Sequence, residues 1–234
     1  MHSAFPSIPL KKSETRYNAR QRSRLSAAHL QNLTHNDYLA LRAHAAVLEQ
    51  DRHGDKVLQL QDGRYLKLFR RKRLISTAAW YPYAQRFADN AIALAQRGIP
   101  CPEVSEVYRI PSIARDAVRY IPLAGETLRQ LVRAGAGTAA LRDTLGAFVA
   151  QLHEAGIYFR SLHLGNIVLT PDNDLGLIDI ADLRATNKPV SQHRRQRNLR
   201  HLLRDAHDQA WIYPDSDTVF DTAYLRQTQE LKRQ

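Results

Sequence analysis

The segment 152–183, LHEAGIYFRSLHLGNIVLTPDNDLGLIDIADL, places the strongest constraint on the fold of this chain. A helical pattern ends at Gly156, and a short polar loop follows it. Two short apolar runs, 167–170 and 175–178, flank the turn-forming sequence Pro-Asp-Asn-Asp. Apolar runs separated by such a turn are typical of a β-hairpin. The segment therefore predicts a helix, a polar loop and a tight hairpin in direct succession.

Two polar residues stand at the ends of this hairpin. Asn166 immediately precedes the first strand and Asp179 follows the second, so the hairpin brings them side by side. Amide and carboxylate oxygens are ligands that Mg²⁺ accepts, and the ion keeps positions for phosphate oxygens. Taken singly, Asn166 could be a turn amide and Asp179 a strand-end acid or a helix cap. Together they favour a site for a nucleotide and its metal ion.

The charge balance narrows the class of partner. The chain has 34 Lys and Arg against 23 Asp and Glu, a formal net charge of +11 and a pI near 10.0. A surface of this kind favours polyanions, namely nucleic acid, an acidic membrane or a phosphorylated substrate. Composition alone does not choose among these three.

Cysteine content and hydropathy bear on the compartment. The single cysteine, Cys101, excludes an internal disulfide and a multi-cysteine zinc site, and it fits a reducing compartment. No apolar run approaches the ~18 residues of a membrane-spanning helix. The first residues lack the apolar core of a secretory signal. We therefore expect a cytoplasmic protein.

The N-terminal half predicts a β-hairpin that carries a lysine. Residues 1–33 are basic and poor in large apolar side chains, so we expect them to be weakly structured. Thr34 is expected to cap a helix that runs to about residue 50. Strands at 56–61 and 64–69 flank an Asp-Gly turn. Lys67 lies between two aromatic residues on one face of the second strand. It either faces a covered site or extends from an edge strand into solvent.

Among the remaining expected elements, strands and helices alternate before the segment 152–183, here called the organising segment, and helices follow it. A break at 122–125 separates a part rich in strands from a part rich in helices. A strongly amphipathic helix is expected to begin at a Thr138 cap and to form core. The expected helices cover 76–97, 126–133, 138–155 and 191–207, and the expected strands cover 104–109 and 114–121.

The order of these elements resembles that of the protein-kinase-like fold. Over about 45–205 the chain is similar to the lipopolysaccharide core sugar kinases, the Kdo and heptose kinase group. The most specific part is the segment 152–183, which resembles the H-G-D-L-H-x-x-N catalytic loop followed by a D-F-G-type aspartate. The later run RRQRNLRHLLR is also similar to the segment that follows the active site. The resemblance implies an α+β, two-lobed fold with a basic segment 1–33, a β-rich lobe 34–121 and a helical lobe 122–234.

The resemblance also implies roles for individual residues. Lys67 would pair with the α- and β-phosphates of ATP, and Asn166 and Asp179 would hold Mg²⁺. Backbone groups of Ile121 and Leu123 would face the adenine. A glycine-rich phosphate loop should precede the hairpin, but only His-Gly-Asp at 53–55 is available.

The catalytic loop departs from the family pattern. Ser161 occupies the position of the catalytic aspartate and Phe159 that of the preceding histidine. Arg160, Ser161 and His163 are the candidate catalytic residues, although a structural role for His163 is equally compatible with the sequence. A serine can orient an attacking hydroxyl but is too weak a base to remove its proton. Asp182 is expected to cap the next turn.

The helix at 76–97 departs from the pattern as well. The family's glutamate partner of the lysine should lie at 85–89, where the chain has no glutamate. Gln85 and Asp89 are the candidate replacements. Neither residue matches the family pattern.

Three functions follow, from different classes. The first is an ATP- and Mg²⁺-dependent kinase acting on a lipopolysaccharide core sugar, or another anionic substrate, with peripheral contact to the inner membrane. The second is a pseudokinase that binds nucleotide or a partner without phosphoryl transfer, which Ser161 favours. The third is a nucleic-acid-binding protein, supported by charge alone and ranked last because no nucleic-acid motif is present. The sequence leaves open the acceptor sugar, its hydroxyl and the oligomeric state.

Overall fold

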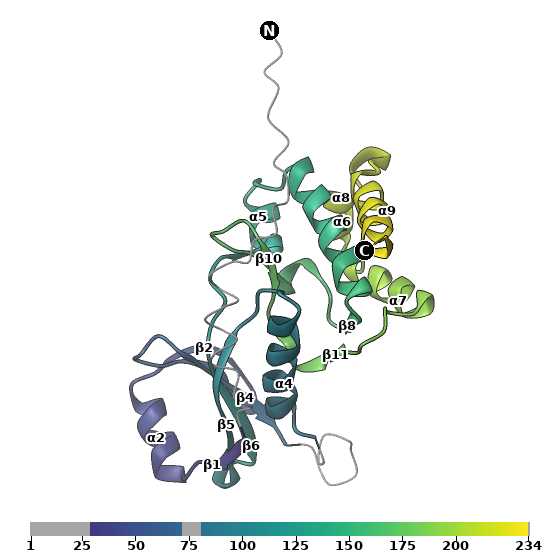
Figure 1. Ribbon diagram of the computed structural model, residues 1–234. Helices are drawn as coiled ribbons and strands as arrows, with labels where there is room; N and C mark the ends of the chain where they lie inside the picture. Colours follow the sequence, from purple (N-terminus) through teal and green to yellow (C-terminus); the bar gives the residue numbers. More distant parts are fainter. Residues whose placement is uncertain (1–28, 72–80, 234) are drawn as a thin grey trace.

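The computed structural model describes residues 29–71 and 81–233, which form a β-rich N-terminal lobe and a helical C-terminal lobe (Figure 1). The predicted α+β, two-lobed fold is confirmed. The N-terminal lobe is built on a six-stranded sheet of order β1-β5-β6-β4-β3-β2. Its strands are β1 (Leu30–Asn32), β2 (Ala46–Asp51), β3 (Gly54–Gln59), β4 (Tyr65–Arg70), β5 (Glu103–Ile110) and β6 (Arg115–Ile121).

The predicted β3–β4 hairpin is confirmed, and it fixes the face on which Lys67 lies. Gly63 has a φ of 78° in the turn, a conformation that glycine adopts at little cost. On β4, Leu66 and Leu68 are buried in the core, whereas Lys67 lies on the opposite face. Because β4 pairs with both β3 and β6, it is an internal strand. The interpretation of Lys67 as an edge-strand lysine is therefore wrong.

The first part of this lobe differs from the prediction. Helix α2 (His35–Ala43) begins at the expected cap, where the Thr34 side chain accepts a hydrogen bond from the amide of Asp37. It ends well before residue 50, because the next residues form β2, which pairs with β3 and gains a ladder of hydrogen bonds. The prediction for 1–28 lies outside the described residues, and Leu30–Asn32 pair with β5 in a strand that was not expected.

Helix α4 (Tyr83–Gln96) lies between the sheet and the C-terminal lobe (Figure 1). Its apolar face, which includes Phe87, Ala91 and Leu94, is buried in the main core. The polar Asn90 is also buried on this helix, and its amide donates to the carbonyls of Ile180 and Leu183. The helix was expected from residue 76, but residues 76–80 lie outside the described part.

The C-terminal lobe is organised by the packing of α6 (Ala139–Glu154) against α9 (Val219–Lys232). Thr138 caps α6 as predicted, accepting from the amide of Leu141. Gly146 lets the two helices approach closely, because a Cβ there would collide with the carbonyl of Phe220. The other helices are α5 (Leu128–Arg133), α7 (Gln192–Leu202) and α8 (Ala206–Ile212). The helix expected over 191–207 is thus two helices, separated near Asp205, which caps α8.

Two small sheets hold the organising segment in place. The predicted hairpin forms as β9 (Ile167–Leu169) and β10 (Leu175–Leu177), joined by β7 (Glu126–Thr127). A second sheet pairs β8 (Ile157–Phe159) with β11 (Leu183–Ala185) and was not predicted. This pairing places the loop after β8 beside the residues that precede β11. Residues 160–163 and 179–182 are therefore neighbours in space.

Among the described residues, none of the helices is long and apolar enough to cross a bilayer.

Candidate active site

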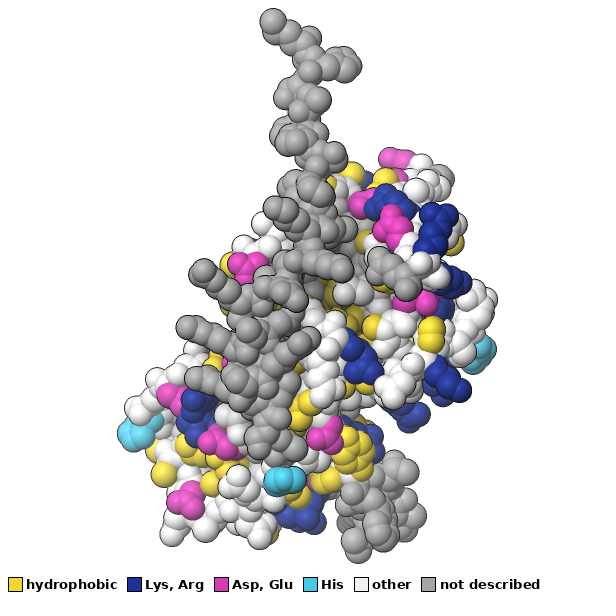
Figure 2. All heavy atoms as spheres, in the orientation of Figure 1, with side chains coloured by type: hydrophobic (Ala, Val, Ile, Leu, Met, Phe, Trp, Pro, Cys, Tyr) yellow, Lys and Arg dark blue, Asp and Glu magenta, His cyan; other side chains and the backbone are white. Residues whose placement is uncertain are grey.

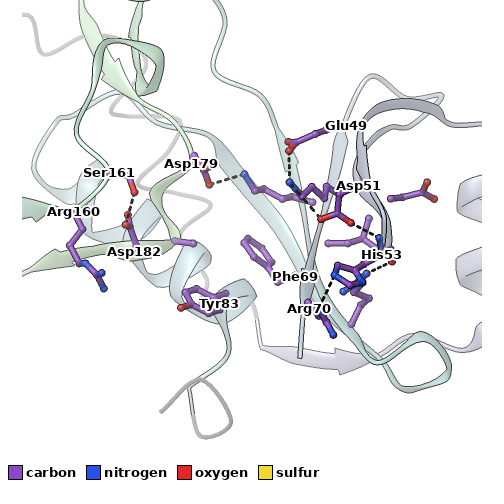
Figure 3. Close-up of a pocket in the computed structure, with 16 residues that line it drawn as sticks. Glu49, Asp51, His53, Phe69, Arg70, Tyr83, Arg160, Ser161, Asp179 and Asp182 are labelled. Atoms are coloured by element: carbon purple, nitrogen blue, oxygen red, sulfur yellow. Dashed lines mark hydrogen bonds and ion pairs between the residues drawn. The ribbon is translucent and has the colours of Figure 1, made fainter. Parts of the chain in front are cut away.

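A cavity of about 500 Å³ lies between the lobes, and four of the predicted site residues line it: Lys67, Arg160, Ser161 and Asp179 (Figure 3). Its N-terminal wall comes from β2, β3, β4 and the turn between β2 and β3. Its other wall comes from the loop after β8 and from the segment that precedes β11. The side chains used below that line it are Lys67, Phe69, Tyr83, Arg160, Ser161, Asp179 and Asp182.

Lys67 and Asp179 form an ion pair across this cavity. The Nζ atom of Lys67 lies 2.7 Å from Oδ1 of Asp179. The lysine side chain is 17% exposed and the aspartate side chain 50% exposed, so solvent reaches the pair from the aspartate side. Asp179 has a φ of 53°, a left-handed conformation that is uncommon for a non-glycine residue and recurs at functional sites. The structure thus brings together two of the residues that the sequence singled out.

Helix α4 presents an aromatic ring to this cavity. The ring of Tyr83 stacks on that of Phe69, with the centroids 6.2 Å apart. Asp89, one candidate replacement for the family glutamate, instead accepts hydrogen bonds from Tyr81 and Gln85 at 2.5 and 2.9 Å. The carboxylate paired with the lysine is therefore Asp179 and not Asp89.

Asn166 fits the role of a metal ligand by the orientation of its amide. Its Nδ2 donates to the carbonyl of Ser161 at 2.9 Å, so Oδ1 is the atom left to face a cation. The residue is 8% exposed and belongs to the short helical turn at Leu164–Asn166. An amide oxygen and one carboxylate, that of Asp179, make an incomplete oxygen set that suits Mg²⁺ carrying water and phosphate oxygens. The residues present therefore fit the ion.

Ser161 contacts the carboxylate of Asp182, which was expected to cap the next turn. Its Oγ donates to Oδ2 of Asp182 at 2.6 Å, and both side chains are partly buried (Figure 3). The prediction that Asp182 caps the next turn is wrong, because the β8–β11 pairing turns the carboxylate toward Ser161. Arg160 also lines the cavity. No spacing between residues in the sequence predicts this Ser161–Asp182 contact.

His163 lies away from the cavity. Its ring stacks on that of His201, with centroids 6.4 Å apart, and it is not among the residues that line the cavity. Burial, followed by the nearby charges of Arg129 and His201, lowers the pKa of His163 below its ordinary value. This placement favours the structural interpretation of His163 over the catalytic one.

A buried polar network holds the end of β8, the strand that leads into the loop with Arg160 and Ser161. Phe159, which stands in the position of the family's histidine, is fully buried, and its carbonyl accepts from Nδ2 of Asn198 at 2.6 Å. Oδ1 of Asn198 lies 3.4 Å from Nε2 of His153, whose Nδ1 lies 2.8 Å from the hydroxyl of Tyr224. Helices α6, α7 and α9 thereby fix the strand that leads into the loop. No local sequence pattern predicts this network, because its polar side chains are spread over three helices.

The remaining predicted positions are the segment expected to form a phosphate loop and the two residues expected near the adenine. The turn at 52–53 between β2 and β3 occupies the place expected for a phosphate loop, and His53 lines the cavity. Gly54 has a φ of 107°, so glycine suits the start of β3. Ile121 ends β6, and Leu123 follows in the connection between the lobes. Neither Ile121 nor Leu123 lines this cavity, and their expected role near adenine stays a prediction.

A comparison with protein families gives a match in the C-terminal lobe. Residues 126–224 match the model of the lipopolysaccharide kinase (Kdo/WaaP) family. This region contains Ser161, Asn166 and Asp179, whereas Lys67 lies outside it. Among curated proteins, none matches the chain.

Among solved structures, the bifunctional kinase-methyltransferase WbdD is similar, with 18% identity and a TM-score of 0.39. The similarity covers 63% of this chain and 32% of WbdD, so the chain spans about a third of that protein's length. The resemblance inferred from the sequence is confirmed by the family model, because residues 126–224 are similar to the lipopolysaccharide kinase (Kdo/WaaP) family.

Proposed function

We propose that this protein is an ATP-dependent phosphotransferase whose acceptor is a sugar of the lipopolysaccharide core. The observation that carries the proposal is the contact of Lys67 with Asp179, which come from different lobes and meet in a cavity that also contains Ser161. Phosphoryl transfer depends mainly on positioning and on charge placed around the phosphates. The family match supports the class of acceptor.

The predicted site residues have distinct roles in this reaction. Lys67 contacts the α- and β-phosphates, a role that requires its amine to exchange Asp179 for phosphate oxygens. Asn166 and Asp179 hold Mg²⁺, which when bound offsets the negative charge of the phosphates. Arg160 brings a further positive charge to the same cavity. Ser161 orients the acceptor hydroxyl for attack on the γ-phosphate.

The charge of the C-terminal lobe supports an anionic acceptor. Figure 2 shows Lys and Arg side chains gathered over the region where Figure 1 draws α7 and α9. A second cavity, of about 600 Å³, lies near β8 and β11. The exposed Arg184, Lys188 and Arg194 are among the residues that line it. Positive side chains suit the phosphates and carboxylates of such an acceptor. The proposal includes peripheral contact with the anionic membrane that carries it.

A pseudokinase remains the second candidate, because Ser161 replaces the aspartate that accepts the proton in active kinases. Such a protein would bind Mg-ATP through Lys67 and Asp179 without transferring phosphate. Both candidates predict nucleotide binding, and only the first predicts a phosphorylated product.

Two measurements test the proposal. Mg-ATP is expected to raise the melting temperature of the wild type, and no rise at any nucleotide concentration would count against both candidates. Incubation with γ-labelled ATP and phosphatase-treated core oligosaccharide then separates them. Label on the oligosaccharide, lost in Lys67→Ala, supports the kinase, whereas binding without transfer supports the pseudokinase.

A further inference from the structure

The missing catalytic aspartate leaves an open question about the proton of the acceptor hydroxyl. In active kinases that proton passes to a carboxylate held at the position of Ser161. A serine alone has no basic group that could take it. The structure, however, places the carboxylate of Asp182 in direct contact with Ser161, with Oγ 2.6 Å from Oδ2.

The contacts of Asp182 leave its negative charge uncompensated. No Lys, Arg or His in the described part of the chain forms an ion pair with it, whereas the neighbouring Asp179 pairs with Lys67. Its second oxygen, Oδ1, is buried and has no hydrogen-bond partner among the described residues. A buried acceptor without a partner is costly and rare in folded proteins, and such groups often have a functional reason.

We infer that Ser161 and Asp182 together replace the catalytic aspartate, with Ser161 as the relay and Asp182 as the terminal base. This inference rests on the proposed phosphotransferase function. Ser161 donates its hydroxyl hydrogen to Oδ2 of Asp182, so the lone pairs of Oγ are free to accept the hydrogen of an acceptor hydroxyl. Both residues line the cavity that contains Lys67 and Asp179.

The proton balance of this step is complete. As the acceptor oxygen forms its bond to the γ-phosphorus, the bond from that phosphorus to the β–γ bridging oxygen breaks, and ADP leaves. The acceptor proton moves to Oγ of Ser161 while the proton of Ser161 moves to Oδ2 of Asp182. Asp182 ends as a neutral carboxylic acid and Ser161 again as a hydroxyl. Release of the proton from Asp182 to solvent restores the site.

The geometry of the fold explains why this substitution is possible. The pairing of β8 with β11 brings Phe159 opposite Leu183. Because the two strands are antiparallel, the residues that follow Phe159 lie beside the residues that precede Leu183. Asp182 precedes β11 and Ser161 follows β8 at this junction. A carboxylate can therefore reach the position of the missing aspartate from the other strand of the pair.

The test uses four variants of the full chain: Asp182→Asn, Ser161→Ala, the double variant Ser161→Asp with Asp182→Asn, and Asp172→Asn as control. Asp172 is an exposed carboxylate in the β9–β10 turn, outside the cavity. Phosphate transfer from γ-labelled ATP to phosphatase-treated core oligosaccharide, and to water, is measured with the affinity for Mg-ATP. Asn at 182 keeps the hydrogen bond from Ser161 while removing the base.

We expect Asp182→Asn and Ser161→Ala each to lower kcat by about a hundredfold, the scale of general-base catalysis, with the affinity for Mg-ATP unchanged. The double variant should recover most of the lost rate, because it places a carboxylate at position 161 itself. A merely structural role for Asp182 would give no such recovery. Asp172→Asn should transfer phosphate at the wild-type rate.

Two outcomes would overturn the inference, and they differ. If the wild type transfers phosphate and Asp182→Asn does so equally fast, the relay is wrong while the kinase function stands. If the wild type binds Mg-ATP but transfers phosphate to neither acceptor, the proposed function is wrong and the relay with it. Ser161→Asp alone is not a clean test, because it would set two carboxylates side by side in the native background.

Discussion

Lys67 and Asp179, 112 positions apart in the sequence, form the 2.7 Å ion pair that joins the two lobes at the active site. In the folded protein the lysine has no glutamate from α4 as its partner, and the aspartate takes that place. In this pair the lysine and the aspartate neutralise each other's charge. In the proposed function, phosphate oxygens would neutralise the lysine and Mg²⁺ would neutralise the aspartate. Under the proposed function, binding of Mg-ATP would therefore separate a pair that already exists.

Asp179→Asn should abolish nucleotide binding with little effect on the fold. Because the aspartate is half exposed, the pair is expected to contribute less than about 1 kcal/mol to the free energy of unfolding. Denaturant unfolding should confirm this small change, while the rise in melting temperature with Mg-ATP should disappear. The control is Asp143→Asn, which breaks the exposed pair with Arg226 and should keep the rise. A normal rise in Asp179→Asn would contradict the assignment.

Asn90→Ala should damage both stability and nucleotide binding. The buried amide donates to the carbonyls of Ile180 and Leu183 at 2.7 and 3.0 Å, and it thereby fixes the segment between Asp179 and β11. Removing it takes one hydrogen bond from each of these carbonyls, while that of Ile180 still accepts from the amide of Leu183, so the loss should be about 1 to 2 kcal/mol of unfolding free energy. Denaturant unfolding and the affinity for Mg-ATP are the measurements. The exposed Asn187→Ala is the matched control, and an equally small loss in both variants would refute the role of Asn90.

The sequence predicted the parts of the site that depend on local pattern. Alternation along β4 placed Lys67 on one face with its aromatic neighbours, without deciding whether that face is covered, and the turn signal at 171–174 placed Asn166 and Asp179 at the ends of one hairpin. These inferences succeed because the period of a strand and the chemistry of a turn are set by neighbouring residues. The cap at Thr138 and the core helix behind it succeeded for the same reason.

The parts that failed depend on contacts between distant segments. The role of Asp182 follows from the pairing of β8 with β11, two strands of three residues that carry no distinct periodic signal. The helix expected to reach residue 50 ends early because the residues that follow it form β2, which is hydrogen-bonded to β3. His163 faces Arg129 and His201 rather than the cavity because of how α5 and α7 pack. Local propensity contains none of this information.

Gly146→Ala should destabilise the protein, although alanine is the better helix former. In an exposed helix this change would stabilise by about 1 kcal/mol. Here the added Cβ would collide with the carbonyl of Phe220, so α6 and α9 must separate, at a cost of about 1 to 3 kcal/mol. Urea unfolding checks the sign of the change. A more stable variant would show that the two helices are less closely packed than the structure describes.

The stability of the protein should fall as the pH is lowered from 6.5, and His153 should be a cause. This histidine is fully buried on α6, and burial, together with the charge of Arg195, lowers its pKa from 6.5 to about 4. Between these values the unfolded chain binds a proton that the folded protein does not bind. Stability from the neutral histidine is therefore fully present above pH 6.5 and is lost as the pH falls toward 4.

The expected loss from His153 is about 2 kcal/mol between pH 6.5 and pH 5, since each pH unit corresponds to about 1.4 kcal/mol. Urea unfolding at constant ionic strength should show this slope in the wild type and a smaller one in His153→Gln, which cannot titrate. The variant will also be less stable at neutral pH, because it disturbs the contacts with Tyr224 and Asn198. The slope, rather than the stability at one pH, is therefore the test. His193→Gln, at an exposed position on α7, should keep the wild-type slope. Equal slopes in His153→Gln and the wild type would mean that His153 is protonated as readily in the folded protein as in the unfolded chain.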